Sequence, residues 1–191
     1  MPGRSMSPDS APPGSGVSAC SQATQDLPDL AALPARIWQT LVQGSGDPAH
    51  GFHWPVLASL RQPGVPDART VVLRHADPAG RVLLIHSHRR AGKIGQLQAR
   101  PPVCLVFHDT ASRTQVRAHG EATVHAQDAL SAQAWQGLAA HSRGLYQGAD
   151  DFAVLRVVVG ELDWLLLDPA GHRRAGLRWS AGGWQSSWLE P

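Results

Sequence analysis

Apolar and polar residues alternate along most of the chain in short runs, and this period of two is typical of β-strands. Residues 55–62, 69–76 and 81–88 form the first three runs. The segments between them, PGVPDA and DPAG, have the composition of turns, so these strands are expected to pair as an antiparallel meander. Further runs predict strands over residues 102–109, 114–125, 152–168, 172–180 and 183–191.

Other segments have the spacing of helices instead. In the first, Ile37 and Leu41 belong to an apolar stripe that ends at Gly44. The second covers residues 89–100, where Pro101 stops it, and the third covers residues 127–141.

The hairpin-type connections between these short strands argue against a doubly wound parallel sheet. They favour a mostly β fold, in which an antiparallel sheet forms a closed or partly closed barrel with inserted helices. Residues 1–25 are rich in Pro, Gly and Ser and contain almost nothing to bury. We therefore expect a disordered tail followed by one domain over residues 26–191.

Charge and cysteine content narrow the class of protein. The 17 Lys and Arg residues stand against 15 Asp and Glu, and they are scattered rather than gathered in a stripe, which argues against a nucleic-acid partner. No apolar run reaches the length of a membrane span, and the N-terminus lacks the pattern of a signal segment. Cys20 and Cys104 form no disulfide framework or CxxC motif, so a cytoplasmic location is expected.

Common catalytic and metal-binding motifs are absent from the sequence. The segment AGKIGQ lacks the first glycine and the Ser or Thr of a P-loop, and no GxSxG motif is present. The 10 histidines include His50 with His53 and His86 with His88, but no cysteine or acidic residue stands beside them at ligand spacing. No metal site is therefore predicted.

Dispersed anion-binding groups remain as candidates. Arg69 and Arg74 bracket an apolar segment, and a period of two sends their side chains to opposite faces. Further basic residues lie at the start of the predicted helix over 89–100 and near the C-terminus: Arg89, Arg90, Lys93, Arg173 and Arg174. Guanidinium groups and helix N-termini are the groups that hold phosphate in proteins.

From about residue 50 to the C-terminus, the order and spacing of these segments resembles the pyridoxamine 5'-phosphate oxidase group of FMN-binding split-barrel flavoproteins. Four ordered motifs carry the resemblance: PDARTVVLRH, LIHSHRRAGKIGQL, RTQVRAHGEA and LDWLLLDPAGHRRAGLRW. The resemblance implies an antiparallel Greek-key split β-barrel, FMN as the cofactor, and a homodimer with FMN at the interface.

The resemblance also implies which residues contact the cofactor. The family's FMN-binding positions match Arg69, Thr70, Val71, Val72, Leu73, Arg74, His86, Ser87, Lys93, Gln115, Trp164 and Arg174. Arg69 and Lys93 take phosphate positions, although Gly92 stands where the family carries an arginine. The residues implied or considered for the substrate are Arg74, His172 and Arg143, and no residue is assigned as a catalytic acid or base.

The implied activity is hydride transfer between a small substrate and FMN. Ala170 stands where members that oxidise pyridoxine phosphate carry an arginine, and the segment WQGLAAHSRGLYQG does not reproduce their substrate-binding set. We therefore expect a substrate other than pyridoxamine phosphate. The alternatives are a flavin-binding module without turnover, acting as a carrier or sensor, and a related split barrel that binds haem or a deazaflavin.

Overall fold

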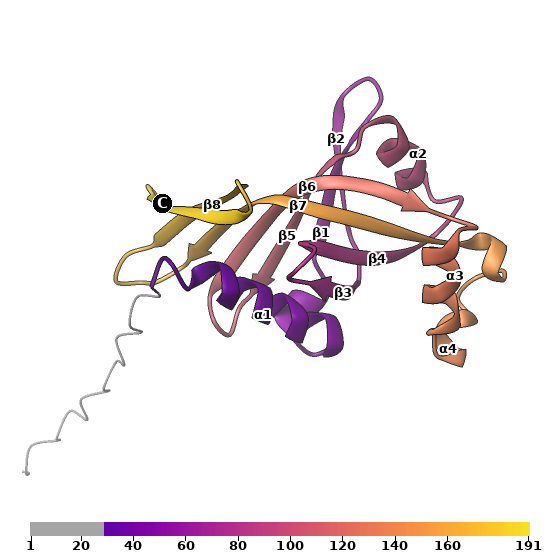
Figure 1. Cartoon of the computed structure of the whole chain (residues 1–191), viewed down its shortest axis with the longest axis horizontal. Helices are drawn as coiled ribbons and strands as arrows, with labels where there is room; N and C mark the ends of the chain where they lie inside the picture. Colours follow the sequence, from indigo (N-terminus) through magenta and orange to yellow (C-terminus); the bar gives the residue numbers. More distant parts are fainter. Residues whose placement is uncertain (1–28) are drawn as a thin grey trace, which may run out of the picture.

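A single antiparallel sheet of nine strands dominates the computed structural model, which describes residues 29–191 (Figure 1). The strands are β1 (Val56–Arg61), β2 (Val65–Thr70), β3 (Leu73–Asp77), β4 (Val82–His88), β5 (Pro102–Asp109), β6 (Thr114–His125), β7 (Phe152–Leu166), β8 (Arg173–Ser180) and β9 (Gly183–Leu189). The helices are α1 (Leu33–Gly46), α2 (Gly92–Ala99), α3 (Ala129–Gln136) and α4 (Ala140–Arg143), with short 3-10 turns at Gly51–His53 and Ala149–Asp151. The predicted mostly β, antiparallel class is confirmed; the predicted tail over 1–25 lies outside the described residues.

Strand β7 organises the sheet because it has different neighbours along its two halves. On one side it pairs with β6 over nearly its whole length. On the other side its first half pairs with β4 and its second half with β8. The remaining strands extend the path to β2-β1-β5-β6-β7-β4-β3, whose two end strands do not pair with each other, so the sheet is not closed.

A close contact at Gly120 bends the long β6–β7 pair. The register shifts between His119 and Gly120, and a Cβ added to Gly120 would overlap the carbonyl oxygen of Val158. Glycine is therefore required at this bulge for β6 to approach β7.

The predicted strand over residues 69–76 is wrong as a single element. Strand β2 ends at Thr70 and β3 begins at Leu73, and the two strands lie at opposite ends of the sheet path. The chain crosses between them with Val71 and Leu73 still buried, so the hydrophobic pattern continues although the strand does not. The expected meander is accordingly limited to the pairs β1–β2 and β3–β4.

The predicted helix over 127–141 is also divided. Helix α3 ends at Gln136, and α4 begins at Ala140 after an extended Ala139. Gly137, which has little preference for helix interiors, lies at the break.

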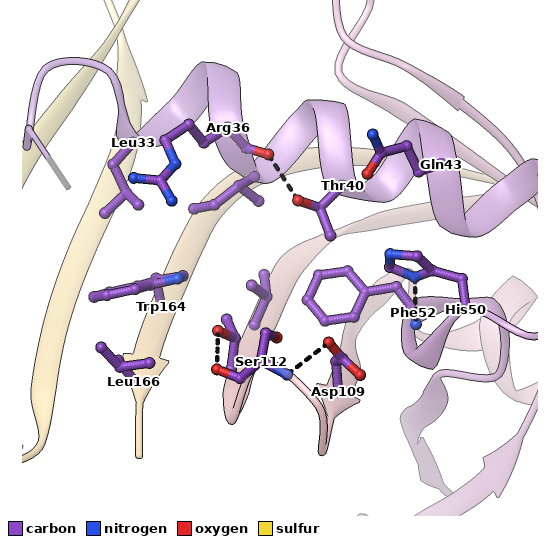
Figure 2. A pocket seen from close by; sticks show the side chains of 13 residues that line it. Leu33, Arg36, Thr40, Gln43, His50, Phe52, Asp109, Ser112, Trp164 and Leu166 are labelled. Carbon is purple, nitrogen blue, oxygen red and sulfur yellow. Dashed lines mark hydrogen bonds between the residues drawn. The ribbon is translucent and has the colours of Figure 1, made fainter. Parts of the chain in front are cut away.

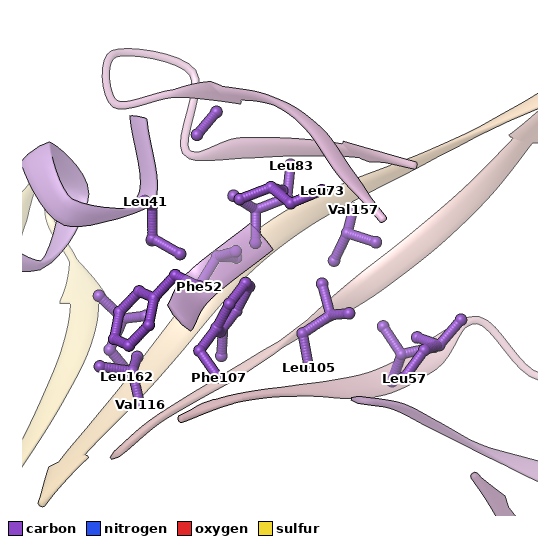
Figure 3. Packing of buried hydrophobic residues seen from close by; sticks show 14 of the residues in the cluster. Leu41, Phe52, Leu57, Leu73, Leu83, Leu105, Phe107, Val116, Val157 and Leu162 are labelled. Carbon is purple, nitrogen blue, oxygen red and sulfur yellow. The ribbon is translucent and has the colours of Figure 1, made fainter. Parts of the chain in front are cut away.

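The core lies between α1 and the face of the sheet that carries Leu57, Leu105 and Ala118, which we call the inner face (Figure 3). Phe52 and Phe107 pack at its centre with their ring centroids 5.4 Å apart. The opposite, outer face of β5–β8 carries Gln115, Arg117 and Asp163, among other half-buried or exposed residues. The two faces thus present different chemistry to any ligand.

Candidate functional site

Acceptors surround the guanidinium group of Arg69 on strand β2. Its Nη1 donates to Ser59 Oγ at 2.6 Å and to the Leu57 carbonyl oxygen at 3.3 Å. Its Nη2 donates to Gln96 Oε1 at 2.9 Å and lies 2.6 Å from Asp67 Oδ2. Ser59 and Asp67 are register partners and Leu57 is the partner of Arg69, so this cluster lies on the inner face. Strand β1 and helix α2 together fix the orientation of Arg69.

Lys93 lies beside this cluster, in the first turn of α2. Burial, followed by the nearby positive charge of Arg69, lowers the pKa of Lys93. Ala91 precedes the helix without a side-chain cap, so the first N–H groups of α2 are open to an acceptor. The structure thus brings together Arg69 and Lys93, the two residues expected to hold a phosphate.

Arg74 and His86 lie next to each other in a groove of about 690 Å³ between β3–β4 and the helices α3 and α4. Nε of Arg74 and Nδ1 of His86 are buried without a hydrogen-bond partner among the residues that the structure describes. Burial and then the charge of Arg74 lower the pKa of His86 to about 4. His86 is therefore neutral at pH 7. Because buried polar atoms are nearly always paired, these two nitrogens indicate a missing ligand or water.

Aromatic rings from α3, the α4–β7 connection and β7 continue this site. The Phe152 ring centroid lies 4.9 Å from that of His86, and Tyr146 and Trp135 lie 5.0 Å and 5.5 Å from Phe152. Tyr146 also contacts His88, with 4.9 Å between the ring centroids. Phe152 is buried, so this aromatic cluster packs behind His86 and fixes the position of its ring at the groove.

The segment from Thr70 to Leu73 links the two clusters. The side chains of Val71, Leu73 and Ser87 are buried, so these residues have little side-chain surface to offer a ligand. Ser87 Oγ donates to the carbonyl oxygen of His88 at 3.0 Å. Any cofactor contact along this segment would involve mainly the backbone.

Gln115 and Arg174 form a second group, on the outer face. Each is a register partner of Leu165, on either side of β7. Arg174 Nη2 donates to Asp163 Oδ2 at 2.8 Å, and Arg117 Nη2 donates to the same oxygen at 2.6 Å. Burial opposes the ionisation of Asp163, but the hydrogen bonds from the two arginines outweigh it and lower the pKa. The carboxylate therefore holds both guanidinium groups on this face.

Trp164 does not join this group, because its side chain lies on the inner face. There it borders a cleft of about 570 Å³ below α1, together with Leu33, Arg36 and Phe52 (Figure 2). Trp164 also packs against Trp188 of β9, with 6.4 Å between the ring centroids.

The three residues considered for the substrate are not brought together within the chain. His172 is exposed in the connection between β7 and β8, near the C-terminal end of β7. Arg143 ends α4, near the other end of β7, and its Nη2 donates to the carbonyl oxygen of Gln136 at 2.6 Å. Arg74 lies in the groove between β3–β4 and the helices α3 and α4, so of the other two residues only Arg143, at the end of α4, is near it.

Sequence reasoning missed the partners of Arg69 and the rings beside His86. Ser59 and Asp67 could have been found, since each is two residues from a position that faces the inner side in the same strand. Gln96 could not, because its proximity depends on how α2 packs against β1. Phe152 and Trp135 belong to a predicted strand and a predicted helix, and no sequence signal places Phe152 beside His86 or Trp135 beside Phe152.

Two features are absent from residues 29–191, the part of the chain that the structure describes. No three His, Cys, Asp or Glu side chains of this part of the chain gather as a metal site requires. None of its helices is both long and apolar enough to cross a membrane.

Comparison with known proteins places this arrangement in a family. The family model described as pyridoxamine 5'-phosphate oxidase matches residues 51–164. Pyridoxine/pyridoxamine 5'-phosphate oxidase of Azorhizobium caulinodans is 39% identical over 64 residues, which cover 34% of this chain and 29% of that protein. The enzyme of the same name from Rhodopseudomonas palustris is 32% identical over 81 residues, which cover 42% of this chain and 37% of that protein. These matches span well under half the length of the curated relatives.

Solved structures show the same fold over most of the chain. A pyridoxamine 5'-phosphate oxidase-related, FMN-binding protein of Nostoc punctiforme superposes with a TM-score of 0.73 and 19% identity, covering 86% of this chain and all (100%) of that one. PhzG of Burkholderia lata, solved with tetrahydrophenazine-1-carboxylic acid, superposes with a TM-score of 0.67 at 14% identity. The match covers 87% of this chain and 95% of PhzG. The predicted split-barrel fold is confirmed by these likenesses. With a family model matched over more than half of its length, this chain belongs to the pyridoxamine 5'-phosphate oxidase family.

Proposed function

We propose that this protein binds FMN and acts as an FMN-dependent oxidoreductase, transferring a hydride between a small substrate and the flavin. The observation that carries the proposal is the pair Arg74 and His86: both residues line one groove, and Arg74 Nε and His86 Nδ1 have no hydrogen-bond partner among the described residues. The family membership supports flavin as the missing ligand. Both the cofactor and the activity are properties proposed for this chain.

The residues present fit both halves of an FMN molecule. A phosphate group would find two cations, Arg69 and Lys93, and the uncapped N-terminus of α2. An isoalloxazine ring would find hydrogen-bonding groups on Arg74 and His86 and the backbone between Thr70 and Leu73. This chemistry also favours FMN over riboflavin, which lacks the phosphate.

We further propose that each cofactor is shared by two copies of the chain. His86 pairs with Val154 and Arg174 pairs with Leu165, at positions eleven residues apart on β7. At ~3.3 Å per residue, the separation along the strand is roughly 36 Å, which is further than one FMN can reach. In a two-fold dimer the outer face of one copy can supply Gln115 and Arg174 to the groove of the other.

The outer face has the composition that such an interface requires. Val56, Ala58, Cys104 and Val106 form an apolar patch there on β1 and β5, because Val56 pairs with Val106 and Ala58 with Cys104. Val56 is 37% exposed although it is apolar. Beside this patch, the arginines held by Asp163 provide positive charge for a bound anion.

The chain's own residues would bind and polarise rather than transfer protons. FMN, when bound, supplies the chemistry of hydride transfer. The guanidinium of Arg74 would stabilise negative charge on the reduced ring, and the guanidinium of Arg174 from the second copy would add to this stabilisation. His86 is neutral at pH 7 because of its lowered pKa, so it offers one donor and one acceptor without adding charge.

The substrate is proposed to differ from pyridoxamine phosphate. Ala170 cannot bind an anionic group, and Arg143, the one arginine of the segment over 135–148, donates to a backbone carbonyl. The groove beside Arg74 and His86 is lined instead by apolar residues such as Leu84, Leu130 and Leu138. These residues favour a largely apolar substrate over a phosphate ester.

The visible absorption spectrum of the purified protein is the first test. A flavin spectrum, with FMN identified by chromatography after heat release, would support the cofactor. A protein that remains colourless after incubation with FMN would refute it. Steady-state turnover against amines, alcohols and reduced nicotinamides then separates an oxidoreductase from a carrier or sensor, since binding without turnover on the whole panel favours the non-catalytic alternative.

A further inference from the structure

The acidic side chain of Asp67 contacts Arg69 and Gln96, two residues of the predicted phosphate cluster. Asp67 Oδ2 lies 2.6 Å from Nη2 of Arg69 and accepts a hydrogen bond from Gln96 Nε2 at 2.8 Å. It lies two residues before Arg69 on the same edge strand, and its side chain is 38% exposed to solvent. The Asp67 carboxylate therefore contacts Arg69 and Gln96 from the solvent-exposed side of the cluster.

The contacts of Arg69 leave little room for a second anion. Ser59 and the Leu57 carbonyl take Nη1, while Asp67 and Gln96 take Nη2. Three of these acceptors are neutral, and Asp67 is the only charged one. A phosphate that approaches Arg69 must either replace the Asp67 carboxylate or remain beside it, next to a like charge.

The net charge of the cluster also indicates that Asp67 competes with a phosphate group. Arg69 and Lys93 carry two positive charges, and Asp67 cancels one of them before any ligand arrives. A phosphate monoester carries close to two negative charges at pH 7. Without Asp67, the cluster would match that charge.

We infer that Asp67 is a built-in competitor: its carboxylate holds the anion position on Arg69 and Gln96, and a phosphate group must displace it to bind. In its application to FMN, the inference rests on the proposed function. The anion site itself depends only on Arg69, Gln96, Ser59 and Lys93.

The opposite role for Asp67 makes the opposite prediction. If the carboxylate served mainly to orient Arg69, its removal would weaken phosphate binding. Ser59, Gln96 and the Leu57 carbonyl already accept three hydrogen bonds from the guanidinium, two from Nη1 and one from Nη2. In addition, the Asn amide oxygen in Asp67→Asn can accept the same hydrogen bonds, so this variant removes the charge and keeps the orientation.

The test compares dissociation constants of FMN, riboflavin and inorganic phosphate for the full chain and two variants. Asp67→Asn should bind FMN and phosphate roughly tenfold more tightly, because one repelling charge is removed. Its affinity for riboflavin should be unchanged. The control variant Asp29→Asn, which removes a charge near the start of α1, should bind all three ligands as the unsubstituted protein does. If Asp67→Asn is unstable, Asp67→Ala repeats the test.

The possible results distinguish the competing role of Asp67 from the proposal that FMN is the cofactor. Unchanged or weaker binding of FMN and phosphate by Asp67→Asn overturns the inference, as does an equal gain for riboflavin. If no variant binds FMN but Asp67→Asn gains affinity for phosphate, the proposed cofactor is wrong and the competing role of Asp67 stands. If the unsubstituted protein binds FMN and Asp67→Asn gains nothing, the cofactor stands and the competing role fails.

Discussion

Gln115 and Arg174 are both register partners of Leu165, one on each side of β7, so their side chains lie in one row across the outer face. They are 59 residues apart in the sequence, and neither contacts the groove that contains Arg74 and His86. This row gives the outer face a defined polar site next to an apolar patch. The relationship is the basis of the shared-site proposal.

Mixing two defective variants tests whether sites are shared between copies. Arg69→Ala and Arg174→Ala should each lose FMN binding. When the two are unfolded and refolded together, half of the dimers combine one chain of each kind, and each such dimer contains one intact site. FMN content should therefore recover to about a quarter of the unsubstituted level. Recovery near zero, with mixed dimers verified by mass spectrometry, would mean that each site is formed within one chain.

Loss of the Arg69 guanidinium should weaken FMN binding specifically through the phosphate. Arg69→Ala removes a charge-assisted contact and leaves Asp67 facing the ligand, so the affinity should fall by about 2 to 4 kcal/mol. Isothermal titration with FMN and with riboflavin measures this effect, and riboflavin binding should hardly change. Arg36→Ala, in the cleft below α1, is the matched control. An unchanged FMN affinity would remove Arg69 from the site.

The lowered pKa of His86 should make stability depend on pH. The unfolded chain protonates this histidine near pH 6.5, whereas the folded protein does so only at about 4. Between these values the unfolded state binds more protons, so the free energy of unfolding falls as the pH drops from 6.5 to 4. The loss attributable to His86 is roughly 3 kcal/mol.

Urea denaturation of the flavin-free protein at pH 7, 6, 5 and 4 measures this dependence. His86→Gln lacks the titrating ring and should lose distinctly less stability over the same range. Equal losses in the two proteins would contradict the assignment. The aspartates with lowered pKa values, such as Asp163, act at more acidic pH, since their contributions are lost as the pH falls through those lowered values.

Truncation of Phe107 tests the core. Its side chain is fully buried and packs against Phe52, so Phe107→Ala should lower the free energy of unfolding by roughly 3 to 5 kcal/mol. Val42→Ala, at a 42% exposed position of α1, should change it by less than about 0.5 kcal/mol. Comparable losses for the two variants would mean that the packing between α1 and the sheet is not as described.

Most of the local elements and the class of the fold could be predicted from the amino-acid pattern alone. Strands such as β4, β5 and β7 follow the predicted runs closely, because alternation between a buried and an exposed face is a property of neighbouring residues. The order and spacing of the four motifs also indicated the family. Both kinds of information are carried by the linear pattern.

The arrangement of those elements and of the site residues could not be predicted in this way, because it depends on packing between distant segments. The separation of β2 from β3 is invisible in the sequence because Val71 and Leu73 stay buried through the crossing. The contact of Asp67 and Gln96 with Arg69, and the placement of Gln115 and Arg174 far from His86, depend on packing between distant segments. Hydrophobic periodicity specifies which face of each element is buried, but the partner of that face is chosen by the packing of the whole chain.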